Sequence, residues 1–498
     1  MQVWNQGYLA ELPYPHHVQP QLAPSWLVAL QTALGQRAGN LQAGFRYCEL
    51  GCGQGLNSLL LAASNPAGQF VAVDFNPQHI EHGRRLAAAA QLSNIEFVQA
   101  DFTELLAQPG EGYDFIVAHG VYSWVAPAQR AAIRGFVEQR LKTNGLLCLG
   151  YMCQPGMAPL AAAQRFIWQH AQHSEGSPPQ RVQAALEALQ ALQQGGAGYF
   201  VEQPEMARLL ARSAEQGLDY LAHELLCEHW QPLQVADVMA EFASLGCQLI
   251  GSAIPLENID AVSLPGNCLA AIQGLTDPAL RETAKDLARN QAQRSDLYQR
   301  GDQALSATEH RQALLDSCWA LLPAAPAPAP GAVEFSTRIG PLQGAAELYQ
   351  PLLQALGEGP QSFAELARRP ALTAQVGQLS GALQLLTWAG YAHPLLHASV
   401  DVTRCQALNR LLAEGTLQGV GYAHLAAPSL GASVSADMLE MAAARVLLEH
   451  PQLRGTLLSE TIQALLRRYG LGVEQVVERV QHFEQRTLPS WQVLGVLP

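Results

Sequence analysis

Tyr47-Cys-Glu-Leu-Gly-Cys-Gly-Gln-Gly55 is the stretch that decides the fold of this chain. It overlaps a short apolar run, residues 45–50, that is predicted to be a buried strand, and it leads into an expected helix over residues 57–63. Three glycines, at positions 51, 53 and 55, allow the backbone to approach a ligand that a Cβ would block. The N-terminus of the following helix offers free N–H groups to a polar ligand. The stretch therefore predicts a nucleotide-binding loop, although Gly-x-Gly-x-Gly alone is a weak signal.

Four more strands are predicted along the chain, and most end in or next to a polar side chain. They cover residues 69–74, 95–101, 113–119 and 145–152. Helices alternate with the strands, and the strands are nearly continuous apolar runs, which is typical of a parallel sheet covered on both faces. Ligands of such α/β sheets lie at the carboxyl ends of the strands. In the predicted fold these ends carry the glycine loop, Asp74, Asp101 and His119.

The spacing of the glycines narrows the class of nucleotide. A Walker loop needs a lysine after the glycines, and Gly55-Leu56-Asn57 has none. Pyrophosphate-binding loops usually show Gly-x-Gly-x-x-Gly, which differs from the spacing here. Instead, Glu49-Leu-Gly-Cys-Gly-Gln-Gly55, with strand-end acids at positions 74 and 101, resembles the S-adenosylmethionine (AdoMet) site of class I methyltransferases.

This resemblance implies AdoMet as the cofactor and suggests which residues hold it. The glycine loop would face the amino-acid part of AdoMet, Asp74 would bind the ribose, and Asp101 would take the adenine amine. Phe75 or Phe102 would lie against the adenine ring, and the segment before the sheet would fold over the cofactor. The expected cofactor-binding residues are Tyr8, Tyr14, Glu49, Gly51, Gly53, Gly55, Asn57, Asp74, Phe75, Asp101, Phe102 and His119.

Longer motifs resemble a narrower family, the methyltransferases that carry a methyltransferase regulatory domain. The rickettsial protein-lysine methyltransferases belong to this group. The matching segments are residues 113–125 (Tyr-Asp-Phe-Ile-Val-Ala-His-Gly-Val-Tyr-Ser-Trp-Val), 8–14, 220–230, 294–300, 390–394 and 426–433. The chain departs from the family at His16, where a serine is usual, and at residues 152–157, where Asn-x-x-Pro-Gly-Trp is usual. Because both departures touch the expected substrate side, family substrates are the least transferable part of the resemblance.

Composition bounds the remaining function classes. The chain has 498 residues, 49% of them hydrophobic and 14% charged, and no apolar run reaches the length of a membrane span. A net charge of −13 argues against a nucleic-acid partner. Nine cysteines without Cys-x-x-Cys pairs, and a start that lacks the pattern of a signal peptide, favour the cytoplasm. We expect no membrane insertion and leave a homodimer open.

The chain is expected to divide into a catalytic part and helical additions. A cofactor-covering segment (1–44) and a Rossmann-like core (45–154) are followed by a helical insertion (155–230) that forms a substrate platform, and by the completion of the sheet (231–260). Next come a helical regulatory region ending in a Pro/Ala linker (261–331), a winged-helix-like domain (332–400) and a helical C-terminal domain (401–498). Residues 278–322 are predicted as long amphipathic helices, and residues 390–394 as a hairpin. Because every cofactor signal precedes residue 125, removal of residues 332–498 is expected to leave AdoMet binding largely intact.

The methyl acceptor is expected to lie after the fourth strand, near His119, Tyr122 and Trp124. This segment lacks the Asn/Asp-Pro-Pro-aromatic motif of amide- and adenine-directed enzymes, and two aromatic rings could enclose an amine cation. His119 fits a proton acceptor for a lysine amine and a backbone-capping histidine equally well. Trp124 fits a core anchor better than a site residue, which makes Tyr122 the stronger candidate.

A second polar group, His223 and Glu224, is expected to form a wall of the substrate cavity, with Glu224 recruiting a lysine; hydrogen bonding between domains explains the pair nearly as well. Adjacent residues on a helix point apart, so no metal site is predicted there. Three functions follow: N-methylation of lysine in a protein substrate, methylation of a small molecule, or a non-catalytic AdoMet-binding scaffold. The intact glycines and strand-end acids argue against the scaffold.

Overall fold

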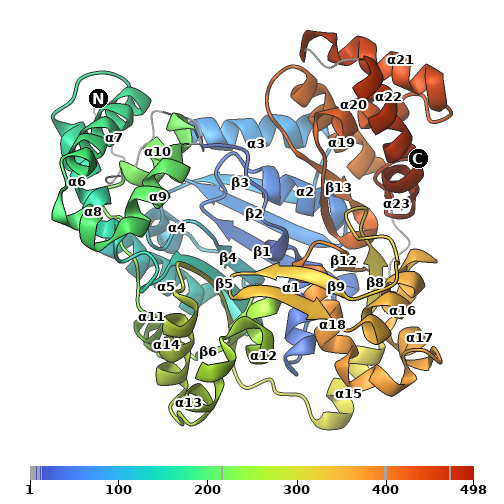
Figure 1. Cartoon of the computed structure of the whole chain (residues 1–498), viewed down its shortest axis with the longest axis horizontal. Helices are drawn as coiled ribbons and strands as arrows, with labels where there is room; N and C mark the ends of the chain where they lie inside the picture. The colour runs from blue at the N-terminus through green and yellow to red at the C-terminus, as the bar shows by residue number, and fades with distance from the viewer. Residues whose placement is uncertain (1–6, 8–11, 13, 215–216, 397–400, 470–472) are drawn as a thin grey trace.

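The computed structural model describes residues 7, 12, 14–214, 217–396, 401–469 and 473–498 (Figure 1). Its centre is a seven-stranded sheet in the order β3-β2-β1-β4-β5-β7-β6. The strands are β1 (Phe45–Leu50), β2 (Gly68–Asp74), β3 (Ile95–Gln99), β4 (Tyr113–Ala118), β5 (Leu141–Met152), β6 (Cys247–Ser252) and β7 (Gln293–Arg300). The first five run parallel, as the apolar runs predict, and β7 lies antiparallel between β5 and β6. The Rossmann-like α/β fold is confirmed.

Helices cover both faces of this sheet. On one face α1 (Pro24–Ala33), α2 (Leu56–Ser64) and α3 (Pro77–Ala89) share a core with the inward side chains of β1 and β2. On the other, α4 (Phe102–Ala107), α5 (Pro127–Arg140) and α11 (Val235–Ala243) pack on the opposite side chains. The two-sided burial explains why the parallel strands read as unbroken apolar runs.

The prediction of helices over residues 278–322 is wrong in its middle. Helices α14 (Pro278–Arg289) and α15 (Ala307–Leu315) flank strand β7, and strand β8 (Cys318–Leu321) follows. Strand β7 is buried but polar: Arg294 Nε donates to Asp296 Oδ1 at 2.8 Å, and its other nitrogens bond acids on α14. Charged residues in a sequence suggest an exposed helix, whereas here the charges neutralise one another inside the sheet.

Five helices between β5 and α11 form the insertion: α6 (Leu160–Gln172), α7 (Pro178–Gln194), α8 (Gly198–Glu202), α9 (Pro204–Ala214) and α10 (Leu218–Leu225). They have a core of their own, which includes Trp124 and Trp230. In Figure 1 they form the green group beside the blue sheet. Two short helices, α12 (Asp260–Ser263) and α13 (Leu269–Gln273), lie between β6 and α14.

Residues 318–394 form a smaller unit. Helices α16 (Ala346–Gly357), α17 (Phe363–Arg368) and α18 (Val376–Trp388) pack on a sheet of β11 (Gln361–Ser362), β8 and β12 (Ala392–Pro394), beside a hairpin of β9 (Val333–Thr337) and β10 (Gly340–Gly344). The hairpin predicted at 390–394 does not form, because β12 pairs with β8. The Pro/Ala segment between β8 and β9 is not a bare spacer, since Ala325 is buried and its carbonyl accepts a hydrogen bond from Arg486.

The C-terminal region, residues 401–498, packs directly on the catalytic sheet's helices. It contains α19 (Thr403–Leu417), β13 (His424–Ala427), β14 (Ala432–Ser435), α20 (Met438–Leu447), α21 (Gly455–Leu466), α22 (Val473–His482), a π-helical turn (Phe483–Thr487) and α23 (Leu488–Val493). Ser64 Oγ at the end of α2 donates to the Ala432 carbonyl at 2.7 Å, and Asn65 Nδ2 donates to the Gly431 carbonyl at 2.8 Å. The apolar side chains of α2 and α19 belong to one continuous core.

Candidate active site

Two adjoining cavities open at the carboxyl ends of β1, β2 and β4. The Asp74 cavity, of about 490 Å³, is lined among others by Asp74, Phe75, Asp101 and Phe102. The Glu224 cavity, of about 300 Å³, is lined among others by His16, His17, Glu49, Asn57, Tyr220 and Glu224. Six residues line both: Tyr14, Gly51, Gly53, His119, Gly120 and Trp124. The structure thus brings most of the predicted site residues together.

The glycine loop has left-handed backbone angles, with φ of +76° at Gly51, +54° at Gly53 and +78° at Gly55. A Cβ on Gly51 would lie 2.3 Å from Val121, and one on Gly55 would lie 2.3 Å from Phe97. At Gly53 a Cβ would meet only Tyr14, at 3.6 Å, and would project into the cavities. Packing therefore requires glycine at positions 51 and 55, whereas at position 53 the left-handed backbone favours glycine and the space beside it is part of the cavities.

Asp74 organises the loop around it. Its Oδ2 accepts the Gly53 N–H at 3.0 Å, and its Oδ1 accepts the Asn76 N–H at 2.8 Å. Oδ1 also lies 3.2 Å from His79 Nδ1, while His79 Nε2 lies 3.1 Å from the Tyr14 nitrogen. Since the Tyr14 N–H can only donate, Nε2 of His79 is the acceptor and Nδ1 donates to Asp74. Asp74 thus fixes both the loop and the segment that covers it.

Glu49 and Asn57 face the Glu224 cavity from the other side of the loop. Asn57 Nδ2 donates to Glu49 Oε1 at 3.3 Å, and the Ser58 hydroxyl donates to Oε2. Burial raises the pKa of Glu49 to about 7, against the effect of these hydrogen bonds. Glu49 therefore joins β1 to the start of α2 rather than standing free in the cavity.

Asp101 lies at the N-cap of α4, where its Oδ1 accepts the N–H groups of Thr103 at 2.8 Å and Glu104 at 2.9 Å. The Phe102 N–H donates to Gln129 Oε1 at 2.9 Å, which ties this end of the cavity to α5. Asp101 and Phe102 line the Asp74 cavity, opposite the glycine loop.

The two aromatic residues after β4 lie differently from the prediction. Tyr122 is fully buried between α5 and α11, where its hydroxyl donates to Glu241 Oε2 at 2.6 Å and accepts from Arg134 at 2.8 Å. It is not among the residues that line either cavity, because it points to the opposite side of the chain from His119. Trp124, expected as a core anchor, packs on the insertion and also lines both cavities. Of the two aromatic residues expected after β4, Trp124 is therefore the one that lines the cavities.

His119 lies against β5, where a Cβ on Gly150 would be 2.3 Å from its Nδ1. Burial, with a smaller effect of His17, lowers the pKa of His119 to about 4. The imidazole is therefore uncharged at neutral pH, and it is a weaker proton acceptor than an ordinary histidine.

The insertion contributes Tyr220 and Glu224, four residues apart on one face of α10. Burial raises the pKa of Glu224 to about 7, although hydrogen bonds from Tyr220 and Trp124 act in the opposite direction. His223 is buried beside the ring of Tyr14, at 5.2 Å between centroids, and is not among the lining residues. Of the pair predicted as a polar wall, Glu224 lines the cavity, together with Tyr220, and His223 does not.

Sequence reasoning missed His17, Gln54, Tyr220 and His79, although the first three line a cavity or the loop and His79 bonds Asp74. The signal for the histidines was their close spacing, in Pro15-His-His17 and His79-Ile-Glu-His82. Tyr8 lies outside the described residues. Within the described part of the chain, no group of three metal-binding side chains comes together, and no helix is long and apolar enough to cross a membrane.

Comparisons with known proteins agree with this geometry. A family described as a methyltransferase domain matches residues 41–207, and one described as a predicted methyltransferase regulatory domain matches residues 218–300. An uncharacterised protein of Synechocystis sp. is 31% identical over 99% of both chains. The chain belongs to the class I AdoMet-dependent methyltransferases that carry a methyltransferase regulatory domain.

The fold of this methyltransferase is also found in a solved structure. PKMT2 from Rickettsia typhi, in complex with AdoHcy, superposes with a TM-score of 0.71 over 97% of this chain and 100% of that chain, at 17% identity. An uncharacterised protein of Rickettsia prowazekii is 32% identical over 29% of this chain and 26% of its own length. AdoMet is the cofactor of the family, and the cavities at the strand ends are where such sheets bind ligands.

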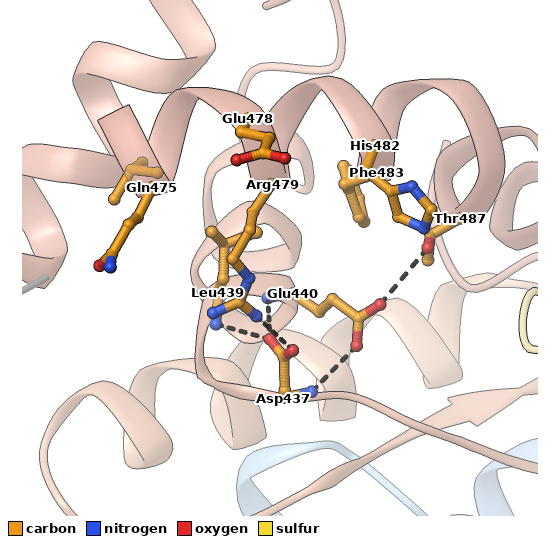
Figure 2. Close-up of a pocket in the computed structure, with 10 residues that line it drawn as sticks. Asp437, Leu439, Glu440, Gln475, Glu478, Arg479, His482, Phe483 and Thr487 are labelled. Atoms are coloured by element: carbon orange, nitrogen blue, oxygen red, sulfur yellow. Dashed lines mark hydrogen bonds and ion pairs between the residues drawn. The ribbon is translucent and has the colours of Figure 1, made fainter. Parts of the chain in front are cut away.

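A further hollow of the methyltransferase, of about 590 Å³, lies in the C-terminal region between α20 and α22 (Figure 2). Two of its charged groups form an ion pair, Arg479 with Asp437, and Glu440 accepts the Asp437 N–H at 3.0 Å. Figure 2 shows these contacts crossing the hollow. It involves none of the elements that form the two cavities above.

Proposed function

We propose that this methyltransferase N-methylates lysine side chains of a protein substrate. AdoMet would occupy the Asp74 cavity, with its methyl group directed past His119 and Trp124, and the lysine amine would enter the Glu224 cavity. The observation that carries this proposal is the Glu224 carboxylate, which lines a narrow cavity next to the cofactor side among aromatic side chains.

A half-buried carboxylate flanked by Tyr220 and Trp124 suits an ammonium group. The charge of Glu224 attracts the cation, and cation–π attraction of roughly 0.5–2 kcal/mol from each ring adds to it. The uncharged state of His119 at neutral pH removes a competing positive charge from the same wall. A carboxylate substrate would instead meet Glu224 as a like charge.

The amine must lose a proton before its lone pair can attack, because an unperturbed lysine has a pKa of about 10.4. AdoMet supplies an electrophilic methyl group on a sulfonium. Glu224, with a pKa raised to about 7 by burial, is better matched to accept the lysine proton than His119, whose pKa is lowered to about 4. Glu224, or water beside it, would first take one proton from the ammonium; the freed lone pair would then form the N–C bond as the C–S bond breaks, and AdoHcy would leave.

Support for a protein substrate comes from the shape of the whole chain. The same arrangement of catalytic sheet, insertion and C-terminal units extends over PKMT2 of Rickettsia typhi, and the motifs quoted above resemble rickettsial protein-lysine methyltransferases. Methylation of a small molecule is the alternative: a trans-aconitate 2-methyltransferase of Paracidovorax citrulli is 34% identical over 22% of this chain. The Glu224 carboxylate in the cavity disfavours an acid of that kind.

The test is incorporation of label from methyl-tritiated AdoMet into protein, with the purified enzyme and a cell lysate. We expect labelled protein that yields methyl-lysine on acid hydrolysis, much less label with Glu224→Gln, and no change with Glu202→Gln, an exposed acid on the same insertion. Label confined to small molecules would contradict the proposal and favour the alternative.

A further inference from the structure

Tyr422 belongs to the C-terminal region, between α19 and β13, yet its side chain contacts residues that lie next to the glycine loop. Its backbone is fixed because its carbonyl accepts from Thr416 at 2.9 Å. Its ring is held against α19, where a Cβ on Gly415 would be 2.6 Å away. The hydroxyl lies 2.8 Å from Nε2 of His82 on α3, and the ring packs on His16 at 4.6 Å between centroids.

The direction of the hydrogen bonds at His82 is set by chemistry. Its Nδ1 lies 2.8 Å from the carbonyl oxygen of Gln54, which can only accept, so Nδ1 carries the hydrogen. Burial lowers the pKa of His82, which favours the neutral ring. Nε2 of a neutral ring then accepts, and the Tyr422 hydroxyl is its donor. Tyr422 thus orients the imidazole that holds Gln54, between Gly53 and Gly55.

From Gln54 the contacts continue to the other side of the Asp74 cavity. The Gln54 side-chain amide donates to the Tyr14 carbonyl, and the Tyr14 N–H donates to His79 at 3.1 Å. His79 donates to Asp74, which in turn accepts the Gly53 N–H at 3.0 Å. These contacts form one continuous series from Tyr422 to Asp74, which we name the Tyr422–Asp74 series: Tyr422, His82, Gln54, Tyr14, His79 and Asp74.

We propose that Tyr422 is a positioning residue of the cofactor site. Through the Tyr422–Asp74 series, its hydroxyl holds the glycine loop and the Tyr14 segment in the conformation that binds AdoMet, so the C-terminal region contributes to cofactor affinity without touching the cofactor. This inference rests on AdoMet occupying the Asp74 cavity; it does not depend on the identity of the methyl acceptor.

The test compares Tyr422→Phe with the wild type in the full chain, by calorimetric titration with AdoMet and by thermal unfolding without it. Loss of one neutral hydrogen bond predicts AdoMet binding weaker by roughly two- to tenfold. The ring and its packing remain, so Tm should fall only by the small amount that the loss of any one hydrogen bond causes. The matched control is Tyr469→Phe in the same region, whose hydroxyl donates to the Leu417 carbonyl at 3.1 Å and lies outside the series; its AdoMet affinity should equal that of the wild type.

A double mutant separates the series from a general packing effect. Since His82 transmits the effect of the hydroxyl, His82→Ala combined with Tyr422→Phe should bind AdoMet no more weakly than His82→Ala alone. Wild-type affinity in Tyr422→Phe, a fall in Tm without a fall in affinity, or additive losses in the double mutant would each overturn the proposal. Because AdoMet binding is measured directly, an error in the lysine assignment would leave these outcomes unchanged.

Discussion

At the scale of single residues, a substitution of Asp74 affects several hydrogen bonds at once. Asp74→Asn replaces one accepting oxygen with an amide that faces N–H donors, and it removes the charge. Hydrogen bonds to a charged group contribute about 1.5–3 kcal/mol each, so AdoMet affinity should fall by roughly ten- to a hundredfold. Calorimetry measures this, with Asp237→Asn, an exposed acid on α11, as the control. Unchanged affinity would remove Asp74 from the cofactor site.

Glu224 gives the site its pH dependence. Its raised pKa of about 7 means that the carboxyl is mostly protonated below pH 7 and charged above it. Because the charged form attracts the lysine ammonium and accepts its proton, kcat/KM for a lysine substrate should rise as the pH increases through about 7. In Glu224→Gln this step should be absent, while the slower rise from lysine's own titration remains. Below pH 6 the two enzymes should differ least.

Glu49 is the other group that could cause a step near pH 7, because burial also raises its pKa to about 7 and it lines the same cavity. A step near pH 7 that persists in Glu224→Gln would assign the titration to Glu49.

The residues show where sequence reasoning succeeds and where it stops. Glycines and strand-end acids could be placed because strand ends in a parallel sheet converge on one edge, and Asp74 and Asp101 lie there. The choice between Tyr122 and Trp124 could not be made, because after a strand the chain leaves its two-residue alternation and side-chain direction depends on the turn. Only the partners Glu241 and Arg134, distant in sequence, reveal where Tyr122 points.

At the scale of elements, the glycine loop predicts a ranking of variants. Alanine at any of the three positions has an unfavourable left-handed conformation, which costs about 1–2 kcal/mol. At Gly51 and Gly55 the methyl group also collides with Val121 and Phe97, which adds about 1–3 kcal/mol. Denaturant unfolding should therefore show a smaller loss for Gly53→Ala than for the other two, while Gly53→Ala still weakens AdoMet binding. Equal losses at all three positions would mean that strain alone decides.

Strand β7 shows why an element can be misread. Its sequence, Gln293-Arg-Ser-Asp-Leu-Tyr-Gln-Arg300, has too few apolar residues for a buried strand. It is buried because Arg294 meets Asp286, Asp296 and Glu282 in one cluster. Ion pairs between two separate elements, here the acids of α14 and Arg294 of β7, cannot be seen in the periodicity of one segment, whereas the apolar runs of β1–β5 carry their own signal.

At the scale of the whole molecule, the C-terminal region cannot be treated as an appendage. The expectation that AdoMet binding survives removal of residues 332–498 does not follow from the structure, because α19 and β13 cover the apolar side of α2. The truncated chain should show a much lower Tm or precipitate, and should lose AdoMet binding. Far-UV circular dichroism and calorimetry would measure both effects.

A protein cleaved between the catalytic part and the C-terminal region tests whether AdoMet binding needs the covalent link or only the contact between the two pieces. Cleavage at a protease site introduced into residues 326–330 should leave the two pieces associated, with AdoMet affinity close to that of the intact chain, because the α2 interface remains. Dissociation of the pieces without denaturant, or a truncated chain that is stable alone, would show that the packing on α2 contributes little.

The cover over α2 also has a consequence for how the protein is made. The outer face of α2 emerges from the ribosome long before its partner, α19, and remains uncovered in the meantime. At 5–20 residues per second, the interval is roughly 20–70 seconds. During that time the nascent chain exposes the apolar face of α2 next to an incompletely folded cofactor site. Synthesis of this enzyme should therefore depend on chaperones that shield the unfinished chain, and ribosome profiling with chaperone pull-down should find them bound until α19 has emerged.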